Sequence, residues 1–530
     1  MRNGCLRKIG WIGCTLGVIS ALVACGGGLP DVSDNLAGPD SAAQQTRPAA
    51  TPLVILTGPA AETRPAGVAL PDEEALGLMN IMIEEGPPLS LTAIDRILEF
   101  HDRRFIAVFI ELMRAAEAGL ISPSGYIPFV KALETLSDQE LGPDWPAWVE
   151  WYGGTDLEPP PGFTSWKGAL LSKIDPGFGE FLQETVPARI RVEEIQWGGV
   201  VIDGIPALNN PQMIPAAQAD YLEPGEPVFG IALHGDARAY PLRIMDWHEM
   251  ANDMVGGIPV SLAYCTLCGA GIAYDGRASD GNTYTFGSSG LLYRSNKLMY
   301  DRQTNSLWNQ LSGEPVLGEL AATNMKLSLL PLVLTSWDAW QRQHPDTLVL
   351  DKSTGFSRPY APGAAYADYF SSSETMFPVW QRSKLLPDKA RIYALHLNGV
   401  PKAYPLDSLV VEQVLNDELA GVPLALVAQR GSIIVDGQSL RSLLSGDGQQ
   451  AGKVTYESGG EVRAYRRGEE TFHPGQQVDT VVDSRGRVWQ VTEEALIGPE
   501  GELAPRLPGH LAYWFGWFAF FPHTLLYQGP

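Results

Sequence analysis

Cys265 and Cys268 are separated by two residues, and Gly269 follows them directly. Thiols at this spacing can face a single point, and the glycine lets backbone amides approach the sulfurs. His248 lies 17 residues before Cys265 and adds an imidazole, a borderline donor that joins thiolates at transition metals. Glu249 is a weaker fourth donor. We therefore predict a site for one zinc, copper or iron ion, held by Cys265, Cys268 and His248, with an open coordination position.

The same two thiols fit two other kinds of chemistry. In an oxidising compartment they would close a structural disulfide in a non-enzymatic envelope scaffold or binding protein. The Cys-x-x-Cys motif also occurs in thiol–disulfide oxidoreductases, where one thiol has a lowered pKa. Those enzymes place the motif at a helix N-terminus, whereas a strand-like segment follows Cys268 here, which disfavours this third alternative. Whether the chain is an enzyme stays open, and no catalytic residue is assigned.

A second group of polar residues lies downstream and is a candidate lining for a pocket beside the thiols. It consists of Asp301, Arg302 and Gln310, and Tyr264 directly precedes the first thiol. For the metal site, Glu249 or Asp301 would orient the ligands from outside the coordination sphere. The alternative without a functional role is that Asp301 belongs to a structural turn. The chain has no Walker loop and no strand-flanked Gly-x-Gly-x-x-Gly, so we expect no nucleotide cofactor.

The elements around the thiols follow from local patterns. Residues 242–255 are compatible with a helix that ends at a pair of glycines. Residues 260–264 form an apolar strand, residues 265–269 a tight turn, and residues 270–274 a returning strand. We therefore expect the imidazole to come from a helix next to a strand–turn–strand unit that carries both thiols.

An internal duplication organises the C-terminal part of the chain. Residues 229–265 align with residues 393–429 at a constant offset of 164, and a later block aligns at an offset of 177. Matched positions, such as Asn252-Asp253 with Asn416-Asp417 or Asp301 with Asp483, are expected to serve the shared fold; for Asn252-Asp253 we expect a helix end or a turn. His248, Cys265 and Cys268 align with Glu412, Gln429 and Ser432, so these groups belong to the first copy alone.

The order of patterns predicts an α+β protein. A flexible tether is expected over 26–71, because its Gly, Pro, Ala, Ser and Thr residues show no apolar period. A small all-α module of helical hairpins is expected over 72–185, where an apolar stripe runs from Phe105 to Met113. Two β-rich α+β units follow, over 190–380 and, as a degenerate copy, over 388–530. The helical module is either packed on these units or a surface for an envelope protein partner.

The first 25 residues predict an exported protein. Arg2, Arg7 and Lys8 precede an apolar run that is too short to span a bilayer, and Leu22-Val23-Ala24 leads to Cys25. This pattern resembles the lipobox of bacterial lipoproteins, in which the cysteine carries lipid. The resemblance implies a membrane anchor at Cys25 and a location at the cell envelope. Because glycine rather than aspartate follows Cys25, the outer membrane is favoured in a Gram-negative organism.

Composition limits the partners. The chain has 530 residues, 61 acidic against 38 basic, and a formal net charge of −23. A surface this negative repels phosphate backbones, so we expect no nucleic-acid partner. The 45% hydrophobic residues are sufficient for sizeable buried cores, and 56 glycines and 41 prolines fit a turn-rich, strand-rich body.

Six spaced motifs resemble one family. They are Trp197-Gly198-Gly199-Val200 with Asp203-Gly204-Ile205-Pro206, Ala239-Tyr240-Pro241-Leu242, Trp247-His248-Glu249, Tyr264-Cys265-Thr266-Leu267-Cys268-Gly269, Ser289-Gly290-Leu291-Leu292-Tyr293 and Tyr300-Asp301-Arg302. Together they resemble the bacterial proteins grouped as a domain of unknown function, DUF3179. The resemblance covers at least residues 190–360 and implies no activity, so the expected chemistry rests on the residues themselves.

Overall fold

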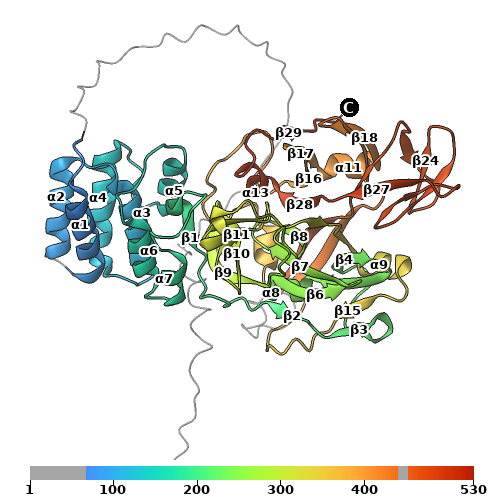
Figure 1. The fold of residues 1–530 in the computed structure, drawn as a ribbon, viewed down its shortest axis with the longest axis horizontal. Coiled ribbons are helices and arrows are strands. Elements are labelled where there is room, and N and C mark those ends of the chain that lie inside the picture. Colours follow the sequence, from blue (N-terminus) through green and yellow to red (C-terminus); the bar gives the residue numbers. More distant parts are fainter. Residues whose placement is uncertain (1–66, 87, 440–451, 530) are drawn as a thin grey trace, which may run out of the picture. The chain divides into compact units, whose positions relative to one another are not determined.

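The computed structural model describes residues 67–86, 88–439 and 452–529. A helical region comes first and a β-rich region with several sheets follows, so the protein is α+β, with 26% helix and 32% strand (Figure 1). This order confirms the predicted fold class. The predicted signal segment, the lipid-bearing Cys25 and all but the last residues of the predicted tether lie outside the described residues.

Seven α-helices lie in the described residues 67–86 and 88–182 of the N-terminal region. They are α1 (Asp72–Glu84), α2 (Leu89–Phe100), α3 (Phe105–Glu117), α4 (Tyr126–Ser137), α5 (Trp145–Gly153), α6 (Phe163–Leu171) and α7 (Gly177–Phe181). The apolar stripe predicted from Phe105 to Met113 lies on α3, which is buried along most of its length and contacts α4, α5 and α6. Helix α5 begins where the Asp144 side chain accepts a hydrogen bond from the Ala147 amide at 3.0 Å.

The helical region is joined to the following strands by buried polar contacts. The Lys167 ammonium on α6 is fully buried, pairs with Glu111 of α3 at 2.5 Å and donates to the Val192 carbonyl at 3.2 Å. Trp380, at the end of the first β-rich unit, packs into the hydrophobic core of the helices. These contacts hold the helices on the body of the protein; they do not test the prediction of an envelope partner.

Three five-stranded sheets make up the first copy. Their orders are β1 (Ile195–Trp197), β9 (Phe286–Tyr293), β10 (Asn296–Asp301), β11 (Leu307–Asn309), β12 (Glu314–Leu317); β13 (Leu329–Leu330), β8 (Ala270–Asp275), β7 (Ile258–Cys265), β6 (Met250–Val255), β2 (Leu208–Asn209); and β14 (Val333–Ser336), β4 (Pro227–Leu233), β5 (Asp236–Pro241), β15 (Leu348–Leu350), β3 (Met213–Pro215). Helices α8 (Leu242–His248), α9 (Trp337–Gln343) and α10 (Ala367–Ser371) connect or follow these strands.

The second copy has the same core strands, but they belong to sheets of four, eight and two strands. Its sheets are β28 (His510–Tyr513), β16 (Arg391–Leu397), β17 (Val400–Pro405), β29 (Leu525–Leu526); β18 (Val414–Leu419), β19 (Val422–Val427), β22 (Arg463–Arg466), β27 (Leu503–Leu507), β26 (Ala495–Ile497), β25 (Val488–Val491), β24 (Thr480–Asp483), β23 (Phe472–Pro474); and β20 (Ser432–Gln438) with β21 (Lys453–Gly460). Its helices are α11 (Leu406–Glu412) and α13 (Trp514–Phe518).

Strand register confirms that the two units are copies. Val228 pairs with Pro241 in the β4–β5 hairpin, and the residues 164 positions later, Ile392 and Pro405, pair in the β16–β17 hairpin. A later strand then pairs parallel to each hairpin. Leu348 lies opposite Arg238, and Leu525 lies opposite Lys402, which reproduces both sequence offsets at once.

The matched polar residues serve the shared fold. Asp253 accepts hydrogen bonds from Arg238 and, at 2.7 Å, from the Tyr240 hydroxyl. Its counterpart Asp417 pairs with a lysine and accepts from the Tyr404 hydroxyl at 2.8 Å. The neighbouring asparagines also match, since each bridges to the backbone of a single phenylalanine. These matched contacts support a structural role for Asn252 and Asp253. The predicted position at a helix end or turn is wrong, because both residues lie within β6.

The predicted helix over 242–255 is wrong in its second half. Helix α8 ends at His248, Glu249 takes a left-handed conformation with φ of 54°, and β6 begins at Met250. The left-handed residue reverses the chain after barely two turns. Strand β6 then pairs with β7 along its whole length, and this ladder outweighs the weak helical tendency of a short segment.

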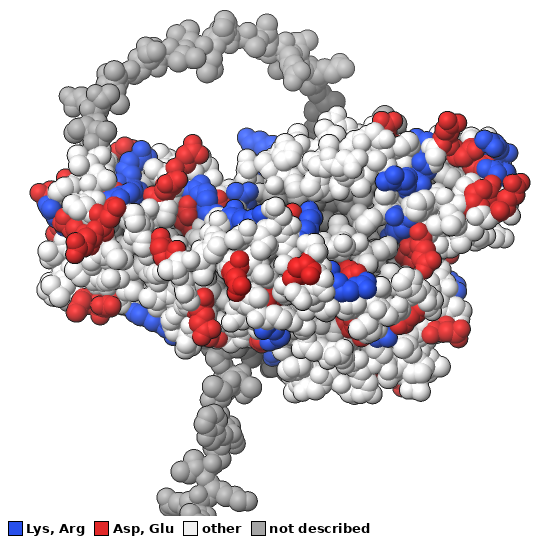
Figure 2. All heavy atoms as spheres, viewed as in Figure 1, with Lys and Arg blue, Asp and Glu red and all other residues white. Residues whose placement is uncertain are grey.

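The surface carries both signs of charge. On the face shown in Figure 2, acidic and basic side chains are interspersed among uncharged residues. Within the described part of the chain, no helix is long and apolar enough to cross a membrane.

Candidate functional site

The two thiols lie at the hairpin between β7 and β8, as predicted. Cys265 ends β7 opposite Ala270, and Cys268 lies in the turn that joins the strands. The Gln310 amide donates to the carbonyls of Ala263 and Ala270, at 3.0 and 2.9 Å, and so bridges the two strands at the neck of the turn. Gln310 thus has a positioning role for the turn that carries the sulfurs.

Both sulfurs are closed off from solvent. Cys265 is 1% exposed and Cys268 is fully buried, and neither is in a disulfide. The Cys268 thiol donates to the Ser295 carbonyl at 3.1 Å. Burial raises the pKa of Cys268 well above its usual range, its hydrogen bond with the Cys265 thiol raises it further, and the Asn296 amide acts in the opposite direction. Cys268 is therefore a neutral thiol in contact with a second one, not a ready thiolate.

The second copy covers the turn. The Tyr513 amide of β28 donates to the Cys268 carbonyl at 2.7 Å, so the two copies share a backbone hydrogen bond at the motif itself. A Cβ added to Gly516 of α13 would lie 3.0 Å from the Cys268 Cβ atom and 3.3 Å from its sulfur. From α10, the Tyr369 hydroxyl donates to the Leu267 carbonyl at 2.6 Å. The turn is therefore held between the two copies.

Glu249 lies beside the turn in a buried ion pair. Its carboxylate is 3.2 Å from the Lys297 ammonium and accepts from the Thr266 hydroxyl at 3.0 Å. Its carbonyl accepts from the Tyr264 amide at 2.8 Å. Because one carboxylate oxygen contacts an ammonium and the other a hydroxyl, Glu249 ties α8 to the turn and is already satisfied.

His248 makes hydrogen bonds of its own, and none of them is with a residue of this cluster. Its Nδ1 donates to the Pro206 carbonyl at 2.8 Å, and its Nε2 is 2.5 Å from the Tyr360 hydroxyl, which contacts the Thr354 hydroxyl at 2.6 Å. Burial lowers the pKa of His248, which fits a neutral ring with both nitrogens in use. Both ring nitrogens already have partners, so binding a metal would break one of these bonds.

No predicted set of metal ligands is assembled. Over residues 67–86, 88–439 and 452–529, no group of three or more His, Cys, Asp or Glu side chains could hold a metal ion. The structure brings Cys265, Cys268 and Glu249 to one region, with Tyr264 on the adjoining strand, and gives both ring nitrogens of His248 other partners.

Asp301 and Arg302 lie in a separate structural turn. The Asp301 carboxylate accepts from the Thr304 amide at 2.6 Å and from the Trp308 indole at 2.8 Å. Asp483 in the second copy accepts from the Trp489 indole at 2.9 Å in the same way. The shared structural turn therefore accounts for the contacts of Asp301. Arg302 is partly exposed and pairs with Asp203 at 2.9 Å.

Several polar groups near the turn had no signal in the sequence. Asp246 on α8 is 4% exposed, has a carboxylate oxygen without a partner, and has a pKa raised well above its usual range by burial and then by Glu249. Burial and the nearby Arg391 lower the pKa of Lys389 to about 8. No motif in the sequence marks Asp246 or Lys389, and only long-range packing buries them and shifts their pKa values.

A family model for a protein of unknown function, DUF3179, matches residues 202–524. The chain belongs to the DUF3179 family. The match extends from the first copy through almost all of the second, so the duplicated body is the DUF3179 unit and the helical region precedes it. No curated protein and no solved structure matches the chain.

Proposed function

We propose that this DUF3179 protein is an exported, lipid-anchored envelope protein without catalytic activity, in which Cys265 and Cys268 form a structural disulfide. The observation that supports this most is that both thiols are buried in a single hairpin turn that the second copy covers. Exported proteins fold where such thiols are oxidised. The disulfide would make the turn a rigid element on which both copies pack.

Oxidation would precede the final packing of the copies. Two S–H bonds break and one S–S bond forms, and two protons and two electrons pass to the disulfide of an envelope exchange protein, which becomes a dithiol. That exchange requires an accessible sulfur, and both sulfurs are buried in the finished fold. The reaction therefore belongs to the stage before Tyr513 and Gly516 close over Cys268.

The same features weigh against the other two chemistries. A transition-metal site needs thiolates and a further donor, but Cys268 has a raised pKa and both ring nitrogens of His248 already have partners. A thiol–disulfide oxidoreductase needs an exposed thiol with a lowered pKa, and neither property holds for Cys268.

The test is a thiol count on protein isolated from the cell envelope. The protein is denatured in acid, alkylated with and without prior reduction, and weighed by mass spectrometry. We expect Cys265 and Cys268 to be labelled only after reduction. Closing a loop of four residues limits the unfolded chain enough to raise the free energy of unfolding by about 2 kcal/mol. Reduction should therefore lower the stability of the wild type by roughly that amount.

The double variant Cys265→Ser/Cys268→Ser is the matched control, because reduction should leave its stability unchanged. Elemental analysis of the same wild-type preparation completes the design. Two free thiols in envelope-derived protein would refute the disulfide. One equivalent of zinc, copper or iron, lost in the double variant, would refute it in favour of the metal site.

A further inference from the structure

One face of the eight-stranded sheet is apolar and exposed in the described part of the chain. Strands β24 to β27 form an antiparallel meander, in which outward residues alternate with buried ones. Val488 is 52% exposed, Ile497 39% and Leu503 65%. Val482 lies opposite Val488, and Ile497 lies between Gln490 and Leu503. These five side chains form one patch without a charged group, which we call the outer face.

The first copy buries the equivalent face. Tyr300 lies opposite Leu307 in β10 and β11, as Val482 lies opposite Val488 in β24 and β25. The structural turn that follows Tyr300 and Val482 is the one that both copies share, which fixes this alignment. Tyr300 and Leu307 lie in a hydrophobic core with Phe181 of α7, whose ring centroid is 5.4 Å from that of Tyr300. The same face is therefore covered in one copy and exposed in the other.

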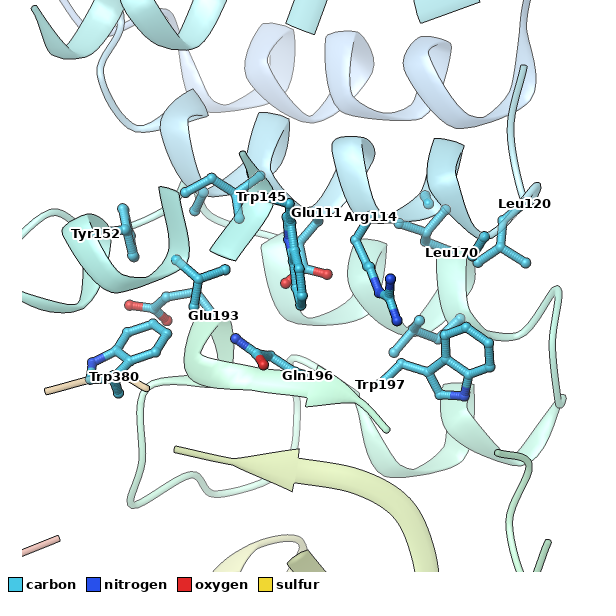
Figure 3. A pocket seen from close by; sticks show the side chains of 16 residues that line it. Glu111, Arg114, Leu120, Trp145, Tyr152, Leu170, Glu193, Gln196, Trp197 and Trp380 are labelled. Atoms are coloured by element: carbon cyan, nitrogen blue, oxygen red, sulfur yellow. The ribbon is translucent and has the colours of Figure 1, made fainter. Parts of the chain in front are cut away.

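The helical region provides the cover of the first copy. Besides α7, helix α3 reaches β1, the edge strand of the same sheet, and Figure 3 shows Arg114 of α3 extending toward Trp197 of β1. Residues 381–390, which precede the second copy, contain no helix that could act in the same way. Contiguous apolar patches that stay exposed on a folded protein mark interaction sites. The outer face is therefore a docking surface.

The two turns at one end of the outer face carry opposite charges. Arg485 and Arg487 lie in the turn from β24 to β25, and Glu500 and Glu502 lie in the turn from β26 to β27. Arg487 pairs with Glu502 within the chain. Arg485 pairs with Glu470 at 2.8 Å, but its side chain stays 69% exposed, and Glu500 is also exposed. One basic and one acidic group therefore remain accessible at the same end of the sheet.

We propose that the outer face binds the outer face of a second molecule of this chain, about a two-fold axis that runs along the strands between β25 and β26. A two-fold interface uses the same patch on both molecules, so the patch must be complementary to itself. Rotation about this axis places β24 over β27 and β25 over β26. The basic turn of each molecule then faces the acidic turn of the other, which brings Arg485 near Glu500 at two places and fixes the orientation.

The size of the patch sets the expected affinity. Four strands of three to five residues, about 4.8 Å apart, cover roughly 250 Å². A standard interface buries about 800 Å² on each partner, so the patch is the centre of an interface whose rim includes the charged turns. We expect a reversible dimer with a Kd of about 10 to 100 µM. This inference goes beyond the proposed function and does not depend on the oxidation state of Cys265 and Cys268.

The test is sedimentation equilibrium of the mature chain, residues 26–530, prepared without lipid, over a range of concentrations. Val488→Glu places a charge in the patch and should weaken dimerisation by about tenfold or more. Val411→Glu is the matched control, because Val411 on α11 is 83% exposed and lies outside the outer face, and it should dimerise like the wild type. A wild type that stays monomeric at about ten times the expected Kd would overturn the proposal. Wild-type dimerisation of Val488→Glu would overturn it as well.

Charge reversal tests the orientation of the two molecules. In a dimer of Arg485→Glu alone or of Glu500→Arg alone, like charges face each other twice, so each variant should dimerise about tenfold or more weakly than the wild type. In an equimolar mixture each variant supplies the charge that the other has lost, and we expect the mixture to associate like the wild type. A mixture that associates no more strongly than the separate variants would refute the two-fold arrangement. Both substitutions are at exposed turn residues, so this test stands even if Val488→Glu does not fold.

Discussion

His510 is expected to make the stability of the protein depend on pH. It begins β28 opposite Ala394, is 9% exposed, and its Nε2 atom has no partner. The ring packs edge-on against Trp517, with 5.7 Å between ring centroids. It also lines a small hollow whose walls come from both copies. Burial in this apolar setting lowers the pKa of His510 from 6.5 to about 4.

The size and sign of the effect follow from that shift. In the unfolded chain the imidazole binds a proton below pH 6.5, whereas in the folded protein it does so only below about pH 4. Between these values the unfolded state holds one more proton, so the free energy of unfolding falls as the pH falls. A difference of 2.5 pKa values corresponds to about 3 kcal/mol, present above pH 6.5 and lost by about pH 4.

The duplication supplies the variant that isolates this contribution. The residue at the corresponding position of the first copy is Val333, which is buried and pairs with β4 in the same register. His510→Val therefore places in the second copy the residue that the first copy uses. Urea unfolding of wild type and variant is compared between pH 7 and about pH 4.5, where most of the expected change has occurred.

The measured quantity is the difference between the two proteins, because other histidines, among them His248 and the partly buried His344, also have lowered pKa values. We expect the wild type to lose about 2 to 3 kcal/mol more than His510→Val over this range. His523→Val changes an exposed histidine and should keep the wild-type pH dependence. Equal pH dependence in the wild type and in His510→Val would show that His510 is not held neutral by burial.

Three further outcomes are expected. Gly516→Ala should lower the free energy of unfolding by about 1 to 3 kcal/mol, because the added Cβ would lie 3.0 Å from the Cys268 Cβ atom. Gly468→Ala is the control, because no atom lies within 4 Å of the Cβ added there. Equal stability of the two variants in urea would contradict the packing argument. Cys25→Ser should abolish lipid attachment, seen as loss of the acyl mass and of detergent partitioning, whereas unchanged partitioning would refute the anchor. Burial lowers the pKa of Lys389 from 10.5 to about 8, so the unfolded state holds the extra proton between these values and stability gains a contribution as the pH rises through this range. Unfolding of Lys389→Met should lack that contribution, and an unchanged pH dependence would contradict it.

Local patterns predicted the elements around the thiols well, with one exception. The strand, turn and strand that carry Cys265 and Cys268 are confirmed as β7, the hairpin turn and β8. The predicted helix over Met250 to Val255 is wrong, because the secondary structure of a short amphipathic segment depends on the segments that pair with it. Its pairing with β7, and a left-handed Glu249, are long-range and conformational features that a helical pattern does not encode.

The residues of the candidate site also differ in how far the sequence predicted their roles. The duplication separated shared residues from those special to one copy, and the matched bonds of Asp253 and Asp417 confirm the structural role of the shared ones. It gave no means to orient His248, since a short helix can direct an imidazole toward the thiols or away from them. In the structure, the carbonyl of Pro206 and the hydroxyl of Tyr360 hold that ring.

By itself, the sequence determined the family, the α+β order and the repeat, because spaced motifs and constant offsets survive without knowledge of contacts. Only the tertiary structure decided that Cys268 is buried and that the second copy covers it. It alone also showed that the outer face of β24 to β27 is exposed, whereas the equivalent face of the first copy is buried. Burial and unpaired hydrogen-bonding groups depend on which distant segments meet, and no local pattern carries that information.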